Sequence, residues 1–500
     1  MKRSKKIASM FLATTMMVGM LAGCGTEVNN DPVESGVVST ETTPVATPEV
    51  KEDPVTVIMR TRCANDTSDM ERVMEYVNEL LLEKANIQLE LQLATNVTEL
   101  NQMTELSFAA EESFDLLWMN SATYTTYASE GSIIPLDDLL AEYAPELLET
   151  IDQKYFELSS YNGQKYAVPC QQIMVTYYGY MIQKQYFDEY GKLPTHVDSY
   201  DEIYPFLDWV AEKHPEVYPM YSSNMNTVRA QQYYESLGST PGFYISKEDP
   251  YTVLPDLEEM YKPQGYTYEQ IQKGWVRPEE SSGLDQSADL AANKYVVRVD
   301  TSRPGIAEEY KVRTGVEWVN VSVGEPYMTG SSVQATMLGV PFTSKNPEAA
   351  VKLLNLLFSD AEVFNALMYG IEGVHYVKDP NCDTHIKTVK NSGWNVYLGG
   401  WAFGNQFLMY TYDDQSTTVW EETKALNDAA VTSPLRGFKF DPTGFETEIA
   451  QVKAVNTEYK DIGSFEGAAE QYDAKIKKAE EAGLSKLIEE VERQIAEYLK

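Results

Sequence analysis

The order of periodic segments between residues 55 and 120 constrains the fold of this 500-residue chain more than any other feature. The apolar run 55–60 and the alternating run 87–93 have the patterns of buried and half-buried strands, and a third apolar run ends at Asn120. Helix patterns occupy the intervals between these runs. Strands that alternate with helices are typical of a parallel, right-handed open sheet, so we predict an α/β fold.

The segments between the predicted strands carry further signals of helices. Ser68 and Glu71 have the spacing of a capping box that would open the first helix, and the second helix is expected over 97–110. In an open sheet of this kind, ligands bind beyond the carboxyl ends of the strands. Neither a GxGxxG nor a GxxxxGK[ST] motif follows these strands, so the sequence does not indicate a nucleotide site.

The N-terminus has the composition of an export signal. Basic residues at positions 2, 3, 5 and 6 precede the uncharged run 7–21, which is short for a membrane-spanning helix. Residues 21–24, Leu-Ala-Gly-Cys, resemble a bacterial lipobox, which implies a signal peptide over 1–23 and lipidation of Cys24. An ordinary signal peptide with an incidental cysteine is the alternative. The polar segment to residue 53 lacks aromatic residues and predicts a disordered tether, so 24–53 form a lipidated linker.

Charge and composition exclude several classes of protein. The 76 acidic residues outnumber the 40 basic ones, for a net charge of −36, and this excess disfavours nucleic acid as a partner because its phosphates would be repelled. The content of 43% hydrophobic and 11% aromatic residues is that of a globular protein. A chain of 500 residues is expected to form two or more structural units.

The remaining cysteines and the histidines give no sign of a metal or redox site. If Cys24 is lipidated, Cys63, Cys170 and Cys382 remain, and these allow either one disulfide with one free thiol or three buried thiols. The four histidines form no HExxH motif and no close pair with a cysteine. We therefore expect no metal site and no cofactor.

Several stretches, taken in order, resemble a known family. These are the lipobox, the tether, the βαβαβ start, "YAVP" at 166–169 and "SKNPEAAVKLLNLLFSD" at 344–360. Together they resemble family 1 of the extracellular solute-binding proteins of bacterial ABC importers, the carbohydrate-binding kind. From "SPLRGFKFDP" at 433–442 to the end, with a helical pair broken at Gly483, the chain resembles the C-terminal domain of unknown function of LipO-type lipoproteins. "YGIEGVHY" at 369–376 and "WAFGNQF" at 401–407 strengthen this match.

The resemblance implies a fold and a role. The fold would be a two-lobed α/β periplasmic-binding-protein fold, type II-like, with extra C-terminal helices. Lobe 1 is expected over 54–168 and 330–375, and lobe 2 over 169–329 and 376–500, with 433–500 as the C-terminal domain. The role would be to capture a polar solute, expected to be a carbohydrate or oligosaccharide, and to deliver it to separate ABC permease subunits. We expect a monomer, lipid-anchored on the outer face of a Gram-positive cell membrane, without enzymatic activity.

Sugar binding requires aromatic faces that stack on pyranose rings, together with amides and carboxylates that bond the sugar hydroxyl groups. Asn120, Ser121 and Tyr124 are candidates because they follow the third strand. Gln171 and Tyr178 are candidates because they lie near the first crossing between lobes. Tyr177 and Tyr178 point opposite ways on a strand, so one of the two is expected in the core.

Two further groups combine aromatic and amide side chains. Trp275 lies in a Gly-Trp-Val-Arg-Pro loop, where it would be either a stacking platform or a buried anchor. Trp401, Asn405 and Gln406 share one short segment, for which a structural turn on Gly404 is the alternative. Arg60 and Arg62 follow the first strand and would suit an acidic ligand, although a surface ion pair is the commoner role of such residues.

Two other functions remain open at this stage. One is a surface sensor or structural lipoprotein whose cleft serves a receptor. The other is a lipid-anchored enzyme acting on glycosides, for which paired carboxylates such as Glu111 and Glu112 would be the signal. With 76 acidic residues such pairs arise by chance, and no acid–nucleophile arrangement is recognisable. The identity of the solute, whether mono- or oligosaccharide or peptide, is not indicated.

Overall fold

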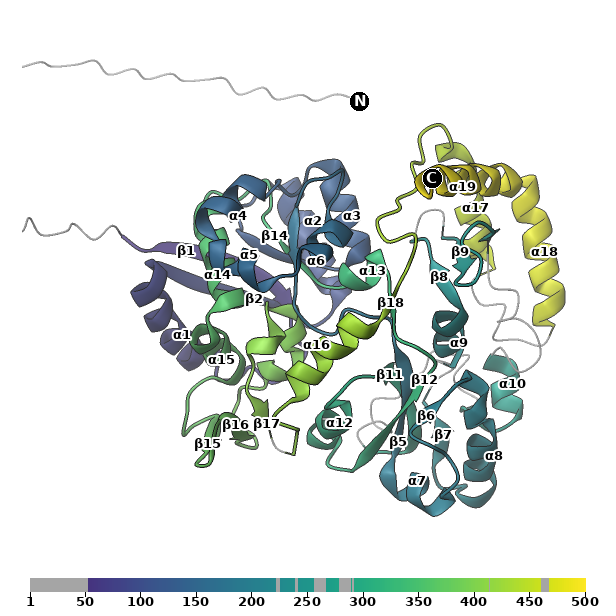
Figure 1. The fold of residues 1–500 in the computed structure, drawn as a ribbon, viewed down its shortest axis with the longest axis horizontal. Coiled ribbons are helices and arrows are strands. Elements are labelled where there is room, and N and C mark those ends of the chain that lie inside the picture. Colours follow the sequence, from purple (N-terminus) through teal and green to yellow (C-terminus); the bar gives the residue numbers. More distant parts are fainter. Residues whose placement is uncertain are drawn as a thin grey trace, which may run out of the picture. The chain divides into compact units, whose positions relative to one another are not determined.

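The computed structural model describes residues 53–221, 225–238, 242–255, 267–277, 289, 292–412, 414–459 and 467–500 (Figure 1). The predicted signal peptide, Cys24 and the tether up to residue 52 lie outside these residues. Within them, no helix combines the length and apolar character needed to cross a membrane. The same residues contain no group of three or more His, Cys, Asp or Glu side chains placed to hold a metal ion.

The first lobe is built on a five-stranded sheet whose order is β2-β1-β3-β14-β4. The strands are β1 (Val55–Arg62), β2 (Ile87–Ala94), β3 (Leu116–Met119), β4 (Ala167–Pro169) and β14 (Met337–Gly339). The pairs β1–β2 and β1–β3 are parallel, as the sequence predicts. Strand β14 runs antiparallel between β3 and β4, so the complete sheet is mixed.

Helices pack around this sheet and share its core. The early ones are α1 (Met70–Ala85), α2 (Val97–Ala109), α3 (Ser121–Glu130), α4 (Asp137–Tyr143), α5 (Pro145–Thr150) and α6 (Gln153–Ser159). The later ones are α13 (Gly330–Val333), α14 (Pro347–Ser359) and α15 (Ala361–Tyr369). The predicted capping box at Ser68 and Glu71 is wrong, because α1 is preceded by Asp69, whose side chain makes no cap bond. The Asp69 carboxylate instead lies 3.0 Å from Nε2 of the buried His375.

The second lobe has its own five-stranded sheet, of order β6-β12-β5-β11-β7. Its strands are β5 (Tyr178–Gln183), β6 (His196–Val197), β7 (Tyr218–Met220), β11 (Tyr295–Thr301) and β12 (Trp318–Val323). Strand β5 is antiparallel to both neighbours. The surrounding helices are α7 (Lys184–Tyr190), η1 (Tyr200–Ile203), α8 (Tyr204–Lys213), α9 (Met225–Tyr233), α10 (Thr267–Gln272) and α12 (Ile306–Thr314).

The C-terminal helices form a third core with a small sheet. They are α17 (Glu446–Glu458), α18 (Ala468–Glu481) and α19 (Leu484–Tyr498), and the sheet contains β8 (Tyr234–Ser236), β9 (Tyr244–Ser246) and β10 (Val253–Leu254) (Figure 1). Gly483 separates α18 from α19 with φ +100°, which confirms the predicted helix break. We call residues 433–500 the C-terminal domain.

Residues 376–429 pack with the first lobe, which differs from the lobe boundaries expected from the sequence. The segment contains β15 (Tyr376–Asp379), β16 (Cys382–Thr388), η4 (Val396–Ala402), η5 (Gln406–Leu408), β17 (Thr411–Tyr412) and α16 (Val419–Ala429). Its large apolar residues Trp394, Phe403 and Trp420 are buried in the same core as the first sheet. The segment is short-stranded and irregular, so it has no period from which its partner could be predicted.

Three chain segments cross between the lobes and are hydrogen-bonded to one another. The middle one contains β13 (Tyr327–Met328), which pairs in parallel with β18 (Val431–Thr432). On its other side, the Tyr327 N–H donates to the Thr176 carbonyl at 3.0 Å, and the Thr176 N–H donates back at 2.7 Å. The Ser433 N–H donates to the Met328 carbonyl at 2.8 Å. We call these three paired segments the hinge.

A buried carboxylate ties the hinge to the C-terminal core. Glu235 on β8 is 6% exposed and accepts hydrogen bonds from the Ser433 hydroxyl at 2.5 Å and the Tyr327 hydroxyl at 3.4 Å. The Lys247 ammonium lies 4.2 Å from the centroid of the Tyr327 ring and donates to the Gln231 carbonyl at 2.6 Å. Burial raises the pKa of Glu235. Two of the three hinge segments are thus fixed to one side chain.

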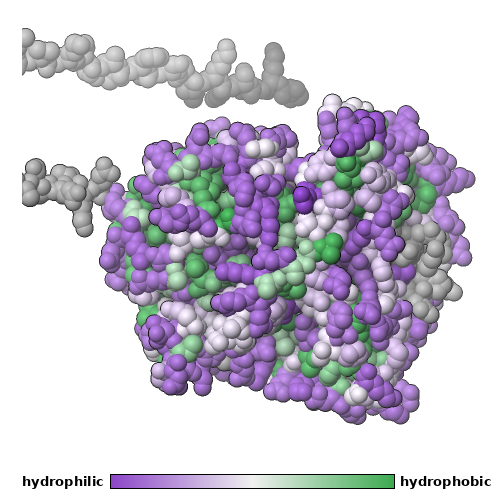
Figure 2. Space-filling model, in the orientation of Figure 1, coloured by the Kyte–Doolittle hydropathy of each residue, from purple (hydrophilic) through white to green (hydrophobic). Residues whose placement is uncertain are grey.

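The surface in Figure 2 is mainly hydrophilic, with hydrophobic residues exposed in small patches. Beneath it, Cys63 and Cys170 are buried and Cys382 is partly exposed, and all three thiols are free. Neither sequence alternative therefore describes the structure fully, because no disulfide forms and one thiol reaches the surface.

The thiols are expected to differ in reactivity. Burial raises the pKa of Cys63, and it raises the pKa of Cys170 to about 12, whereas hydrogen bonds from Thr384 lower the pKa of Cys382. Because the thiolate is the nucleophile, iodoacetamide at pH 7.5 should modify Cys382 at least about tenfold faster than either buried thiol. Peptide mass spectrometry of the chain from Val55 measures the three rates. In urea the rates should converge, and a native Cys170 that reacts as fast as Cys382 would contradict the assignment.

Candidate functional site

The crossings join the two sheets at the carboxyl ends of their parallel strands. Strand β4 ends at Pro169, and residues 170–177 lead to Tyr178, which pairs with Thr301 at the end of β11. The return crossing leads to Met337, which pairs with Met119 at the end of β3. Ligands of open α/β sheets bind beyond these strand ends. A solute site is therefore expected between the first edge, at the ends of β1, β3 and β4, and the second edge, at the end of β11.

Arg62, Trp118 and Trp401 form a cluster at the first edge, which we call the edge cluster. The two indole rings meet edge to face with centroids 6.1 Å apart. The Arg62 guanidinium carbon lies 5.1 Å from the centroid of Trp401 and 5.9 Å from that of Trp118. Trp118 is 4% exposed, whereas Trp401 and Arg62 are both partly exposed. A partly exposed indole beside a guanidinium offers an apolar face for a sugar ring and donors for its hydroxyl groups.

The residues that follow β3 divide between the edge and the core. Asn120 and Ser121 are partly exposed at the start of α3. The Asn120 side-chain oxygen accepts a hydrogen bond from the Thr123 N–H at 3.0 Å, so this amide also caps the helix. The prediction for Tyr124 is wrong, because its ring is fully buried and its hydroxyl donates to the Ser159 carbonyl at 2.5 Å. Tyr124 supports α3 and cannot stack on a solute.

The structure brings Gln171, Asn405 and Gln406 together, but their hydrogen bonds stabilise the backbone. The Gln171 N–H donates to the Gly404 carbonyl at 3.0 Å, and the Gln406 N–H donates to the Gln171 carbonyl at 2.8 Å. The Asn405 amide donates to the Phe358 carbonyl at 2.9 Å and accepts from the Phe407 N–H. All three residues are between 3% and 7% exposed. The prediction that these three residues bind the solute is therefore wrong, and their role is structural. Their hydrogen bonds fix the segment that carries Trp401 beside the end of β4.

The two aromatic candidates of the second lobe have different outcomes. Trp275 is fully buried in the second core and its indole N–H donates to Asp208 at 2.8 Å, so the buried-anchor alternative is correct. Tyr178 lies at the second edge and is partly exposed, although it also packs against the second core. Tyr177 is partly exposed as well. Neither tyrosine is confined to the interior.

The sequence did not indicate Trp118 as a candidate, and it offered Arg62 only for an acidic ligand or a surface ion pair. Trp118 lies inside the third apolar run, where the pattern gives only a core position. Arg62 is the last residue of β1, and the two indole rings become its neighbours only through the fold. Arg60 is buried, with hydrogen bonds to Gln92 at 2.7 Å and to Ser107 at 2.8 Å, so it supports the sheet.

A separate cavity of about 1110 Å³ lies between the first lobe and the C-terminal domain. Residues 154–163 contribute its first-lobe wall, and Met328 and Thr432 contribute the hinge. The opposite wall consists of the loop 436–443 and α19. None of the candidate residues predicted from the sequence, and no member of the edge cluster, lines this cavity.

Two family models match the chain. The model described as bacterial extracellular solute-binding protein matches residues 64–363. The model described as a domain of unknown function (DUF3502) matches residues 434–500, which coincide with the C-terminal domain. The two matches follow one another without overlap, in the order expected from the sequence.

Similar proteins are found among curated sequences and solved structures. A carbohydrate ABC transporter substrate-binding protein from Streptococcus pneumoniae serotype 4 is 23% identical over 100% of this chain and 99% of its own. The crystal structure of the N-glycan transport solute binding protein NgtS from Streptococcus pneumoniae is similar with a TM-score of 0.76 and 20% identity, covering 89% of this chain and 99% of that one. Its complex with Man5GlcNAc gives a TM-score of 0.73 at 20% identity, covering 89% and 98%. These likenesses show the two-lobed fold.

The buried position of Lys439 at the cavity predicts how the stability of the protein depends on pH. The Lys439 ammonium lies 4.6 Å from the ring centroid of Tyr161 and 5.5 Å from that of Tyr124, and burial lowers the pKa of Lys439 to about 8. A lysine in the unfolded chain titrates near pH 10.4, so between these values the unfolded state binds more protons and stability rises with pH. Replacing Lys439 with Met should remove this rise.

The measurement is urea unfolding of the wild type and of Lys439→Met at pH 7.5, 8.5 and 9.5. The free energy of unfolding of the wild type should increase relative to that of the variant by up to about 1.4 kcal/mol per pH unit. Lys486→Met is the matched control, because the Lys486 side chain is 71% exposed on α19. Parallel pH curves for the wild type and Lys439→Met would contradict the prediction.

Proposed function

Since the chain belongs to the bacterial extracellular solute-binding proteins, we propose that it captures an oligosaccharide and delivers it to an ABC importer. The observation that carries this proposal is the edge cluster, in which the partly exposed Trp401 lies beside Arg62 at the end of β1. Indole faces bind the C–H surfaces of sugar rings, and a guanidinium bonds their hydroxyl groups. The protein binds its solute and performs no turnover.

The relatives support a carbohydrate as the solute. One is named a carbohydrate ABC transporter substrate-binding protein, and the structural relative is named an N-glycan transport protein and was crystallised with Man5GlcNAc. Because both span nearly the whole of this chain, the two-lobed body and the C-terminal domain are shared features. We propose that the solute binds Arg62, Asn120, Ser121 and Trp401 at the first edge and Tyr178 at the second edge.

We infer the cellular location of the protein from the predicted signal peptide and lipobox at its N-terminus. Cleavage before Cys24 and lipidation of its thiol would hold the protein on the outer face of the membrane, as expected for a Gram-positive cell. The tether that follows would let the lobes reach a permease. The partners are accordingly the solute, the permease subunits and the membrane through the lipid alone, with the protein acting as a monomer.

The solute site is tested by Trp401→Ala. Loss of a stacked indole should weaken binding of an oligosaccharide by about ten- to a hundredfold, at 1.4 kcal/mol per decade. Isothermal titration with a panel of N-glycan fragments, such as Man5GlcNAc, measures the change. Trp209→Ala is the matched control, because Trp209 is also partly exposed but lies on α8 among Phe206 and Tyr190. Unchanged affinity in Trp401→Ala would remove the edge cluster from the proposal.

The anchor is tested by Cys24→Ala. Without the thiol no lipid can be attached, so the variant should appear in the medium or accumulate with its signal peptide uncleaved. Cell fractionation and mass determination of the N-terminus distinguish these two products. A variant that is cleaved normally and still partitions with the membrane would rule out lipid anchoring, because a single cysteine is the only attachment point of the proposal.

A further inference from the structure

The second lobe touches the first lobe through helix α12, at a distance from the hinge (Figure 1). Val312 on α12 is partly buried and packs against the core of the first lobe. The Arg313 guanidinium donates to the Leu398 carbonyl of η4 at 3.1 Å. The Lys311 ammonium donates to the carboxylate of Asp414, which follows β17. We call this packing of α12 on the first lobe the α12 contact.

At its start, α12 meets the first lobe with no space between the two. Gly305, which precedes α12, has φ +76°, and a β-carbon there would lie 2.7 Å from Cγ2 of Val419 and 2.9 Å from Nε2 of Gln415. Both neighbours are buried. Arg303 bonds Glu309 at 2.6 and 2.7 Å and thereby fixes the turn around Gly305. Because packed interiors resist compression, the two surfaces cannot approach each other further.

Helix α16 connects this contact to the hinge. The helix begins at Val419, which touches Gly305, and it ends at Ala429, two residues before β18. At 1.5 Å per residue, a helix of this length is a lever of about 16 Å. Near its end, the Asn427 side chain accepts from the Met174 N–H at 2.8 Å and donates to the Gln172 carbonyl at 2.7 Å. These bonds fix α16 to the first crossing, so rotation about the hinge displaces α12 along or away from its start.

The cavity lies on the other side of the hinge from the α12 contact. In Figure 1, α12 and β17 lie on one side of β18, and α6 and α19, which carry walls of the cavity, lie on the other. The C-terminal domain is joined to the second lobe, because β8 of its small sheet follows α9 directly in the chain. A rotation of the second lobe that moves α12 away from α16 therefore narrows the cavity.

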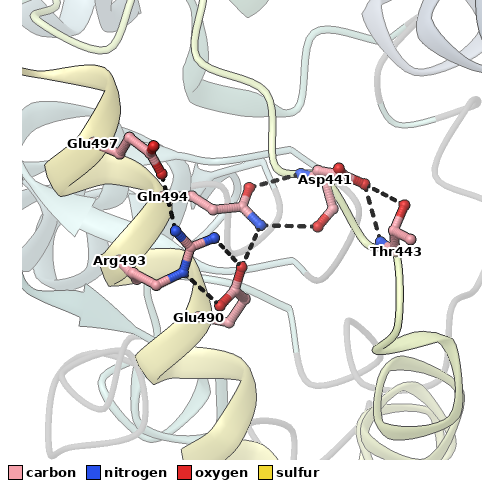
Figure 3. A network of polar contacts seen from close by, with 6 residues as sticks. All are labelled: Asp441, Thr443, Glu490, Arg493, Gln494 and Glu497. Atoms are coloured by element: carbon pink, nitrogen blue, oxygen red, sulfur yellow. Dashed lines mark hydrogen bonds and ion pairs between the residues drawn. The ribbon is translucent and has the colours of Figure 1, made fainter.

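The cavity wall on the C-terminal domain moves as one piece (Figure 3). The Gln494 side chain accepts from the Asp441 N–H at 2.8 Å and donates to the Asp441 carbonyl at 3.0 Å. On the same helix, Arg493 donates to Glu490 at 2.7 and 2.9 Å and to Glu497 at 2.9 Å. A probe placed on α19 therefore reports the position of the whole wall.

The α12 contact also carries a cost. The Gln415 side-chain oxygen accepts from the Tyr412 N–H at 3.2 Å, but its amide nitrogen is buried and finds no acceptor among the residues that the structure describes. A buried donor without an acceptor is unfavourable, and it gains water when the contact separates. The ion pair of Lys311 and Asp414 is partly exposed, so it holds the contact only weakly. The contact is thus tightly packed but easily separated.

We propose that the α12 contact is a stop, which ends the rotation of the lobes where the cavity is widest and separates when the cavity narrows. Gly305 sets the position of the stop, because a residue without a side chain lets α12 reach Val419 and Gln415. The inference goes beyond the proposed function, because no residue of the contact belongs to the edge cluster or lines the cavity. Its test requires no solute, so it stands apart from the assignment of the solute site.

The test substitution is Gly305→Ala, which places a methyl group between α12 and α16. The β-carbon contact of 2.7 Å must relax toward the usual separation of about 3.5–4.0 Å, so α12 should stay about 1 Å or more away from its stop. Gly315→Ala is the matched control. Gly315 ends the same helix with φ +75°, so its backbone strain is the same, but a β-carbon there would have no atom within 4 Å.

The measurement is the distance between pairs of spin labels by double electron–electron resonance, in the full chain carrying Cys24→Ala and Cys382→Ser. One pair, at the exposed positions 381 and 188, spans the lobes on the side of the α12 contact. The other pair, at 157 on α6 and 486 on α19, spans the cavity side. Gly305→Ala should lengthen the first distance and shorten the second, each by about 1 Å or more. Gly315→Ala should leave both at their wild-type values.

Unchanged distances in Gly305→Ala, or equal shifts in Gly315→Ala, would overturn the stop. Shifts of both distances in the same direction would also overturn it, because a pivot moves its two sides oppositely. If Gly305→Ala does not fold, as judged by circular dichroism, Lys311→Met combined with Arg313→Gln decides the result. These two side chains are at least partly exposed, and their loss should raise the population of the longer first distance about twofold. An unchanged population would overturn the proposal.

Discussion

The structure depends on the short strand Tyr327–Met328, because the chain can cross between lobes only through segments paired with it. Its backbone bonds Thr176 on one side and the segment 431–433 on the other, so the three crossings form one strip. Glu235 then bonds the side chains of Tyr327 and Ser433. Burying this carboxylate is unfavourable, and the raised pKa records that cost, but the two hydroxyl donors offset it. The lobes are therefore expected to pivot about the strip rather than slide along it.

The same topology explains why a few side chains at the first edge matter. The first two crossings connect strand ends, so the polar ends of β1 and β3 lie at the edge of the first sheet from which the chain passes to the second lobe. At that edge, the Arg62 guanidinium packs over the rings of Trp118 and Trp401. Such contacts stabilise the positive charge of the guanidinium and fix the orientation of its N–H donors. The buried bonds of Gln171 and Asn405 hold Trp401 in this position.

The sequence predicts helices and strands better than it predicts binding residues, and particular residues show why. Strands β1 and β2 were predictable because each has a local pattern, a continuous apolar run in β1 and an alternation in β2. Tyr124 and Trp275 have the residue type and the position of a sugar platform, but burial decides their role, and burial is a property of partners distant in sequence. Arg62 and Trp401 are 339 positions apart, and no local pattern brings them together. Segment 376–429 joins the first core for the same reason: its buried aromatic residues follow no period.

The cavity and the hinge are linked by shared residues. Met328 and Thr432 belong to the paired hinge strands and also line the cavity, while residues 154–163 line it from the first lobe. A change in the hinge angle therefore changes the width of this cavity. The C-terminal domain carries Ser433, which is bonded to Glu235 at the hinge, and Lys439, which lines the cavity, so this domain is joined to the hinge and to one wall of the cavity rather than standing apart from the lobes.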